Sequence, residues 1–291
     1  MSKKIIGMDI GGTTFSSALF DENLNLLASS DKRMISEIGS TMGLIDALSN
    51  QINELSNNQV DGVGVSCPGP LDSKNGAILE TPNLKLLQNV NLKRELEKKC
   101  SSDVYIENDA NLFTWGEWRQ QKTSPEVFAG VTLGTGLGFG LMINNKLFTG
   151  AHGLATEYAI SPLDHGNWET YISISGIQRI SKEILGRKID PKSLCHMAEE
   201  SDADALEVWN SFGTHLGSAL SHFINMVDPG MISIGGGVSK AFKFFDLSMR
   251  QSLEINSPSY KCNQIHIFES NHKELSSQIG AALLFLSKQR P

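Results

Sequence analysis

The sequence predicts an α/β protein built from two similar lobes. A strand at residues 4–9 runs into the Asp9–Thr14 segment (DIGGTT), and the Gly134–Gly138 segment (GTGLG) repeats this layout in the second half. A further strand follows each turn. Glycine has no Cβ, so backbone N–H groups in such turns can close on phosphate oxygens. One such turn alone indicates a tight β-hairpin, whereas two at matching positions predict two lobes that face each other across a phosphate.

The first lobe is predicted to begin with a run of strands and to continue with alternating helices and strands. Strands at 14–20 and 24–28 follow the first glycine turn, and a helix at 43–55 carries apolar residues on one face. A strand at 60–65 then ends in a rigid loop at 66–70. A helix at 92–99, a strand at 104–106 and a helix that carries Trp115 and Trp118 complete the lobe.

The second lobe is predicted to restart the pattern. Strands at 127–133 and 139–143 flank the second glycine turn, and a hairpin at 144–145 returns through 146–149. A long helix at 204–227 stops at Asp228–Gly230 (DPG), and a buried strand at 231–234 runs into Gly235–Gly237. We place the first lobe at residues 1–115 and the second at 116–275. The final helix, about 276–291, is a candidate to pack back on the first lobe.

Composition excludes several classes of protein. The chain has 291 residues, a net charge of −7 and a charged fraction of 20%, which argue against disorder and against a nucleic-acid partner. No apolar run is long enough to cross a bilayer, and residues 1–8 resemble a first strand rather than a signal peptide. The four cysteines lack paired spacing, so neither a disulfide framework nor a zinc knuckle is predicted. We therefore expect a cytoplasmic protein.

The motifs taken together resemble those of the ROK family of sugar kinases over nearly the whole chain. No single motif is specific, but their order and spacing are. They are Asp9–Thr13, Pro68–Pro70, Pro82–Leu84, Glu107–Asn111, Gly134–Gly138, Glu157, Glu169 and Gly235–Gly237. The resemblance implies a two-lobed actin-like ATPase (ribonuclease H-like) fold, in which two mixed sheets are flanked by helices with a cleft between them. It also implies a glucokinase-like, ATP-dependent transferase of carbohydrate metabolism.

The resemblance assigns the phosphate end of the site. Asp9 would position Mg²⁺, directly or through water, because a carboxylate at the end of a buried strand suits that ion. The residues that would bind ATP are Gly11, Gly12 and Thr13 in the first lobe and Gly134, Thr135, Gly136, Gly236 and Gly237 in the second. Phosphoryl transfer needs positioning and neutralised charge, which a backbone cradle and a cation supply. The alternative for Gly235–Gly237 is a strand-to-helix turn without a ligand.

Asp109 is the candidate catalytic base. It follows a buried strand, and a carboxylate there can accept the proton of a sugar hydroxyl that attacks the γ-phosphate. The alternative is a helix N-cap, where Asp is common. The resemblance implies a sugar pocket formed by Gly69, Asn83, Asn108, Asp109, Glu157 and Glu169. A carboxylate can accept hydrogen bonds from two neighbouring hydroxyls, although a solvated surface position is the commonest fate of Glu.

The sequence departs from the family pattern after Glu157. Ile160 replaces a histidine that ligates zinc and touches the sugar in relatives, and the Ser161–Trp168 loop carries no cysteine. Structural zinc needs about four nitrogen or sulfur ligands, and this loop offers only His165, so no zinc is expected. His165 could reach the sugar in place of the missing histidine, or it could simply be exposed.

We therefore expect an ATP-dependent kinase for the 6-hydroxyl of a hexose or N-acetylhexosamine, with lobe closure limiting ATP hydrolysis in the absence of sugar. One alternative is a weak or inactive sugar sensor without a DNA-binding module, because the first strand begins by residue 4 and the chain is acidic. A degenerate kinase that binds a partner protein is a third hypothesis. The family resemblance also suggests a homodimer.

Overall fold

The chain forms two compact units of mixed α/β structure. The computed structural model describes residues 3–289, apart from residues 58, 82–83, 124, 164, 264 and 273–274. Unit 1 comprises Met1–Ser124, Leu147–Ala155 and His272–Pro291, and unit 2 comprises Pro125–Lys146 and Thr156–Asn271. The first boundary therefore falls at 124–125, later in the chain than the boundary at 115–116 proposed from sequence.

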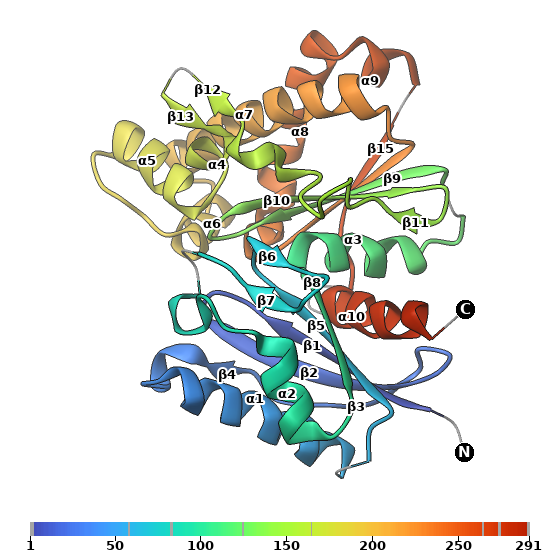
Figure 1. Cartoon of the computed structure of the whole chain (residues 1–291). Coiled ribbons are helices and arrows are strands. Elements are labelled where there is room, and N and C mark those ends of the chain that lie inside the picture. The colour runs from blue at the N-terminus through green and yellow to red at the C-terminus, as the bar shows by residue number, and fades with distance from the viewer. Residues whose placement is uncertain are drawn as a thin grey trace. The chain divides into compact units, whose positions relative to one another are not determined.

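The central sheet of unit 1 is mixed (Figure 1). Its strands are β1 (Lys4–Ile10), β2 (Thr14–Asp21), β3 (Leu26–Ser29), β4 (Arg33–Met34), β5 (Gly62–Cys67) and β8 (Asp103–Asn108), in the order β3-β2-β1-β5-β8 with β4 paired to β2. β1 and β2 are antiparallel, whereas β5 is parallel to both β1 and β8. Parallel strands end at the same edge of a sheet, so the carboxyl ends of β1, β5 and β8 meet there.

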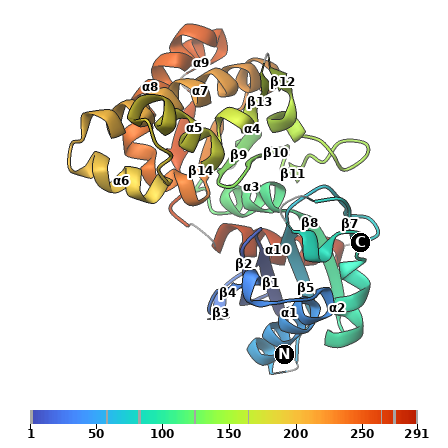
Figure 2. The same ribbon diagram turned by 90° about the vertical axis from the view of Figure 1, so that its left-hand side faces the viewer.

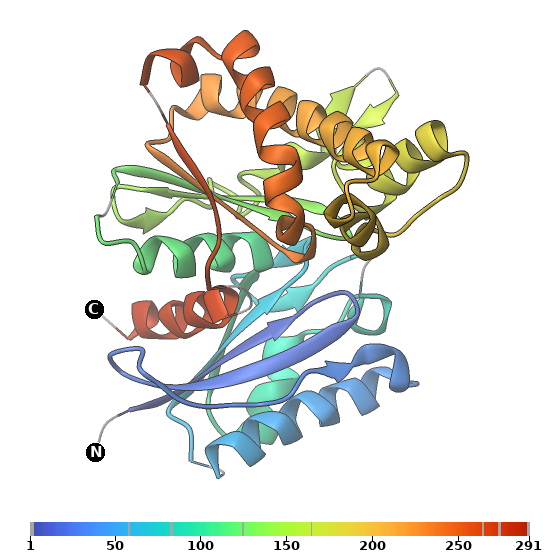
Figure 3. The same ribbon diagram turned by 180° about the vertical axis from the view of Figure 1, so that it is seen from behind.

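Helices cover both faces of this sheet, with α1 (Thr41–Ser56) on one side of the strands and α10 (Leu275–Lys288) on the other (Figure 3). Alternating residues of β1 feed two separate cores, as the pleat of a strand requires. Ile6 and Met8 pack in a core with residues of α1 and α2 (Leu92–Cys100), while Ile5 packs with residues of α10. β1 is therefore buried on both faces, which fixes the position of the residues at its end.

Close backbone contact holds α10 against the sheet and against α3 (Asp109–Arg119). A Cβ on Gly7 or Gly64 would overlap a carbonyl oxygen of α10, so only glycine allows this approach. The hydroxyl of Ser276 on α10 also donates a hydrogen bond to the buried carboxylate of Glu117 on α3. α10 therefore packs closely against both the central strands and α3.

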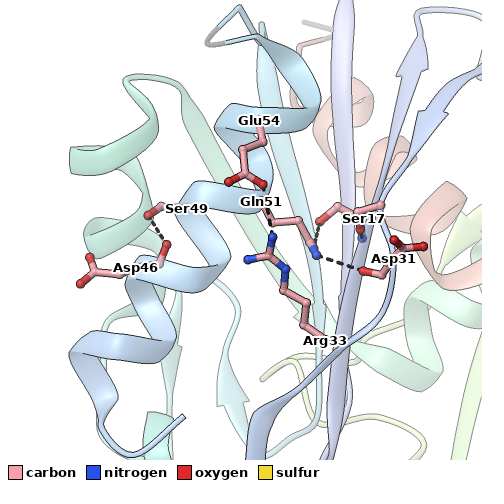
Figure 4. A network of polar contacts seen from close by, with 8 residues as sticks. Ser17, Asp31, Arg33, Asp46, Ser49, Gln51 and Glu54 are labelled. Carbon is pink, nitrogen blue, oxygen red and sulfur yellow. Dashed lines mark hydrogen bonds and ion pairs between the residues drawn. The ribbon is translucent and has the colours of Figure 1, made fainter. Parts of the chain in front are cut away.

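A small polar network joins β2 to α1 (Figure 4). The buried Ser17 hydroxyl donates to Gln51 Oε1 at 2.8 Å, and Gln51 Nε2 donates to the carbonyl oxygen of Asp31 at 3.3 Å. Arg33 and Glu54 form an ion pair beside it at 3.3 Å. Each buried polar group in this network has a partner, so the network costs little desolvation energy.

Unit 2 repeats the sheet layout of unit 1. Its strands are β9 (Val127–Leu133), β10 (Leu137–Ile143), β11 (Lys146–Leu147), β14 (Met231–Gly235) and β15 (His266–Glu269), in the order β11-β10-β9-β14-β15. β9 and β10 are antiparallel, and β14 is parallel to both β9 and β15. The glycine turn therefore joins a central hairpin in each unit, which confirms the duplicated layout predicted from sequence.

The helices of unit 2 form one large apolar core with its sheet. They are α4 (Trp168–Tyr171), α5 (Ile174–Leu185), α6 (Pro191–Glu199), α7 (Ala203–Val227), α8 (Phe242–Asn256) and α9 (Pro258–Asn263). α7 and α8 pack side by side (Figure 2). None of the helices in the described part of the chain combines the length and apolar character needed to span a bilayer.

Two segments differ from the sequence prediction, and one of them bears on the site. β5 continues through Cys67, so Ser66 and Cys67 belong to a strand and not to the predicted loop. β3 begins at Leu26 because a turn precedes it, in which Leu24 has φ of 67°. The extension of β5 arises from pairing with β1 and β8, which local sequence does not report.

Candidate active site

Five predicted or newly found residues gather at the carboxyl edge of the unit 1 sheet. Asp9 on β1 is the register partner of Ser66 on β5, and Cys67 is the partner of Asn108 on β8. Asp109 follows Asn108 directly as the first residue of α3. Three parallel strands thus place two carboxylates, an amide, a hydroxyl and a thiol at one sheet edge, where ligands bind in open α/β sheets.

Ser66 orients the carboxylate of Asp9. Its hydroxyl is fully buried and donates to Asp9 Oδ1 at 2.7 Å, a short charge-assisted hydrogen bond. Within the described ranges, no group of three or more His, Cys, Asp or Glu side chains is arranged to hold a metal ion. Mg²⁺ is commonly held by one or two carboxylates together with substrate phosphates, so a single oriented carboxylate fits that ion.

Asn108, not Asp109, caps α3. The Asn108 side-chain oxygen accepts hydrogen bonds from the backbone N–H groups of Ala110 at 2.9 Å and Asn111 at 3.3 Å. Its side-chain oxygen is therefore committed to the helix, and its amide N–H₂ group is the part suited to donate to a ligand. Because the capping role belongs to Asn108, the N-cap reading of Asp109 was wrong.

Buried Glu107 stabilises the junction between β8 and α3. Its Oε1 accepts from the backbone N–H of Asn108 at 2.8 Å and from Asn111 Nδ2 at 3.2 Å. Both Glu107 and Asn111 are nearly inaccessible to solvent. The two residues hold the start of α3 in place and therefore hold Asp109 at the sheet edge.

Burial raises the pKa of Asp109, and hydrogen bonds from the backbone N–H groups of Ala110 and Asp109 itself oppose this effect. Burial also raises the pKa of the Cys67 thiol well above its usual range, reinforced by the negative charges of Asp109 and Asp9. The Cys67 side chain therefore stays a neutral thiol at neutral pH. A carboxylate with a raised pKa is a better proton acceptor than an ordinary one.

The first glycine turn joins β1 to β2 beside these residues. Gly11 N–H donates to the carbonyl oxygen of Thr14 at 2.8 Å, and Ile35 N–H donates to that of Thr13 at 2.8 Å. Gly12 and Thr13 line a pocket of about 400 Å³ in unit 1 together with Ile35, Leu84 and Lys85. Gly69 lies two residues beyond the end of β5 and is partly exposed. Asn83 lies outside the described residues.

The second glycine turn and the Gly235–Gly237 segment lie side by side in unit 2. Gly134 N–H donates to the carbonyl oxygen of Gly136 at 3.0 Å, and Ile174 N–H donates to that of Gly134 at 2.9 Å. Gly236 has φ of +89°, and a Cβ on it would overlap the carbonyl oxygen of Leu133 at the end of β9. By contrast, a Cβ on Gly134 or Gly237 would meet no protein atom within 4 Å. The fold therefore requires glycine at 236 but leaves open space over 134 and 237.

The two predicted sugar-binding glutamates lie on adjoining segments of unit 2. Glu157 begins a short 3₁₀ helix (Glu157–Ile160) and is exposed, and Glu169 lies in the first turn of α4. Tyr158 and Trp168 stack between these segments with ring centroids 6.3 Å apart. Glu169 Oε2 accepts a hydrogen bond from Leu137 N–H at 3.0 Å, so its carboxylate lies on the second glycine turn.

Two residues of the segment that departs from the family pattern are open to solvent. Ile160 is 58% exposed, and His165 lies exposed in the short hairpin of β12 (Pro162–Leu163) and β13 (Gly166–Asn167). Sequence reasoning missed Ser66, Cys67 and the supporting role of Glu107. Their positions follow from strand register, which a single sequence specifies only weakly.

Several known proteins are similar to this chain. The model of the ROK family matches residues 5–288. A glucokinase from Thermotoga maritima is 31% identical over 264 residues, which are 82% of this chain and 83% of that protein. An N-acetyl-D-glucosamine kinase from Pectobacterium atrosepticum is 28% identical and covers 96% of this chain and 98% of its own length. A ROK family glucokinase from Streptomyces griseus, solved with glucose and AMPPNP, superposes with a TM-score of 0.83 at 26% identity, covering 97% and 98% of the two chains.

Proposed function

Because this chain belongs to the ROK family and is similar to a glucokinase and an N-acetyl-D-glucosamine kinase, we propose that it transfers the γ-phosphoryl group of ATP to a hexose or N-acetylhexosamine. The 6-hydroxyl is the proposed acceptor, and Asp109 is the proposed base. The observation that carries the proposal is the partly buried Asp109 residue at the start of α3, placed at the sheet edge that also holds the oriented Asp9 carboxylate.

Asp109 performs the proton transfer in this proposal. A sugar hydroxyl is a weak nucleophile at neutral pH, and its proton must leave as its oxygen attacks phosphorus. Burial makes the ionised form of Asp109 less favourable, which raises its affinity for that proton. The amide N–H₂ group of Asn108 is adjacent in the chain and donates to a neighbouring sugar oxygen. The fixed helix start limits the motion of both side chains and so holds the acceptor hydroxyl in line.

Backbone turns bind the phosphates. Gly11, Gly12 and Thr13 contribute N–H groups from unit 1, and Gly134, Thr135 and Gly136 contribute them from unit 2. The open space over Gly134 and Gly237 supports this role, because the fold itself does not demand glycine at either position. Bound Mg²⁺ neutralises phosphate charge, and Asp9, held by Ser66, is the residue that would position it.

Glu157 and Glu169 select the sugar. Each carboxylate can accept hydrogen bonds from hydroxyl groups, and the stacked pair Tyr158 and Trp168 keeps their two segments together. The exposed Ile160 offers no hydrogen bond at the position where relatives place a histidine. We therefore expect the sugar preference of this chain to differ from that of zinc-containing relatives.

An ADP-release assay over hexoses and N-acetylhexosamines, with Mg-ATP, tests this function. We expect turnover with one or a few sugars and none with the matching 6-deoxy sugar, which lacks the proposed acceptor. Turnover with the 6-deoxy sugar would refute the 6-hydroxyl assignment. A folded protein that binds a sugar without turnover would instead favour the sensor hypothesis.

A further inference from the structure

The carboxylate of Glu169 lies where the second glycine turn is expected to bind phosphate. Its Oε2 accepts the backbone N–H of Leu137 at 3.0 Å, and Leu137 is the first residue of β10, directly after Gly136. The same oxygen lies against Gly136, so closely that a Cβ on Gly136 would overlap it. A side chain at 136 would therefore displace the carboxylate, although the backbone of Gly136 is not in the left-handed region.

This contact is built by the local fold and lies wholly within unit 2. The Asn167 side chain caps α4 by accepting from Thr170 N–H at 2.9 Å, which fixes the short helix that carries Glu169. Ile174 N–H donates to the carbonyl oxygen of Gly134, so the segment that follows α4 is tied to the same turn. Both ends of this segment thus hold the carboxylate on the turn.

A carboxylate and a phosphate compete for such a position. Both are anions that accept backbone N–H groups, and two like charges within a few ångströms repel each other. We propose that Glu169 occupies an anion position of the Gly134–Gly138 turn before nucleotide binds, and that a phosphate group of ATP must displace it. This inference rests on the proposed phosphate-binding role of the turn, and it gives Glu169 a function besides sugar binding.

The displacement links the two substrates. Once a phosphate has taken the Leu137 N–H group, the Glu169 carboxylate is free to accept hydrogen bonds from sugar hydroxyls. Conversely, a sugar that holds Glu169 away from the turn removes the competitor of the phosphate. Glu169 therefore lowers the affinity of the sugar-free protein for nucleotide.

The test is the affinity of the full-length protein for Mg-AMPPNP without sugar, measured by calorimetry for wild type, Glu169→Gln and Glu169→Ala. Gln keeps an oxygen that can accept from Leu137 N–H but carries no charge, and Ala removes the side-chain competitor. Both variants should bind Mg-AMPPNP about fivefold to tenfold more tightly than wild type does, and this gain in affinity should be smaller at high salt. Glu254→Gln on α8 is the matched control, because Glu254 is an exposed glutamate of the same unit, and it should bind like wild type.

Two results separate this inference from the proposed function. If wild type binds Mg-AMPPNP and neither folded Glu169 variant binds it more tightly, the displacement inference is wrong while nucleotide binding stands. If wild type and both variants fail to bind the nucleotide, the proposed function and the inference fall together. Thermal unfolding of each variant establishes that it is folded.

Discussion

Ser66 provides a direct test of how the sheet edge orients Asp9. We consider Ser66→Ala, which removes one hydroxyl from a fully buried strand position and leaves the backbone unchanged. The hydroxyl donates to Asp9 Oδ1 at 2.7 Å. Ser17→Ala is a matched control, because Ser17 is equally buried in the same sheet and its hydroxyl donates to neutral Gln51 at 2.8 Å (Figure 4).

The effects of the two substitutions should differ in size and in kind. A hydrogen bond to a charged group contributes about 1.5–3 kcal/mol, whereas a neutral one contributes about 1 kcal/mol. Both variants should therefore lose stability in urea unfolding, and Ser66→Ala should lose more. Only Ser66→Ala should also weaken Mg²⁺-dependent nucleotide binding, by roughly tenfold if about 1.4 kcal/mol of carboxylate orientation is lost.

The assay compares AMPPNP affinity with Mg²⁺ and with EDTA for wild type and both variants. We expect Ser66→Ala to reduce the difference in AMPPNP affinity between Mg²⁺ and EDTA. Ser17→Ala should leave this difference unchanged. If Ser66→Ala showed the same Mg²⁺ dependence as Ser17→Ala, the serine hydroxyl would have no part in orienting Asp9 for the cation.

Four further predictions concern Asp109 and the glycine segments. Asp109→Asn should lower kcat by about 10²–10⁴, the usual contribution of a general base, in a steady-state kinase assay. The same variant should be more stable than wild type at neutral pH. Because the pKa of Asp109 is raised by folding, the folded wild-type protein favours the protonated acid, and wild type loses stability as the pH rises through that pKa, whereas Asn does not titrate. Urea unfolding at several pH values should show the gain vanish below about pH 4, and a gain that persists there would contradict a charge effect. For wild type, kcat/KM should fall as the pH drops through the raised pKa of Asp109. This fall should occur above about pH 4, where an ordinary Asp titrates. An acid limb at or below about pH 4 would argue against Asp109 as the base. Gly236→Ala should reduce the thermal midpoint because of the positive φ and the overlap with Leu133, whereas Gly237→Ala should leave it nearly unchanged and weaken AMPPNP binding. Equal thermal losses in the two variants would refute the distinction.

Strong local patterns carried much of the fold prediction. β9 and α7 match the expected segments to within a residue, because an apolar strand between turns and a long apolar stripe are strong local signals. Short elements that depend on tertiary packing were not predicted, such as α6 and α9. β15 was also missed, because its edge position depends on pairing with β14, far away in the sequence.

The sequence offered candidate site residues by type, and the structure adds the contacts between them. Asp109 stands at the start of a helix after a strand, as its motif indicated, but the capping role of Asn108 depends on backbone geometry. Ser66 and Cys67 join the site through the parallel register of β1, β5 and β8. The contact between Glu169 and Leu137 N–H joins two segments more than thirty residues apart, as their numbering shows, and no local pattern encodes it.

The most direct test of Asp109 as the base is ADP release by wild type and Asp109→Asn, each with and without the preferred sugar. Wild type should release ADP much faster with sugar than without it, and Asp109→Asn should lose the sugar-dependent part while still binding Mg-AMPPNP and sugar. If Asp109→Asn retained sugar-dependent ADP release at the wild-type rate, Asp109 would not be the base.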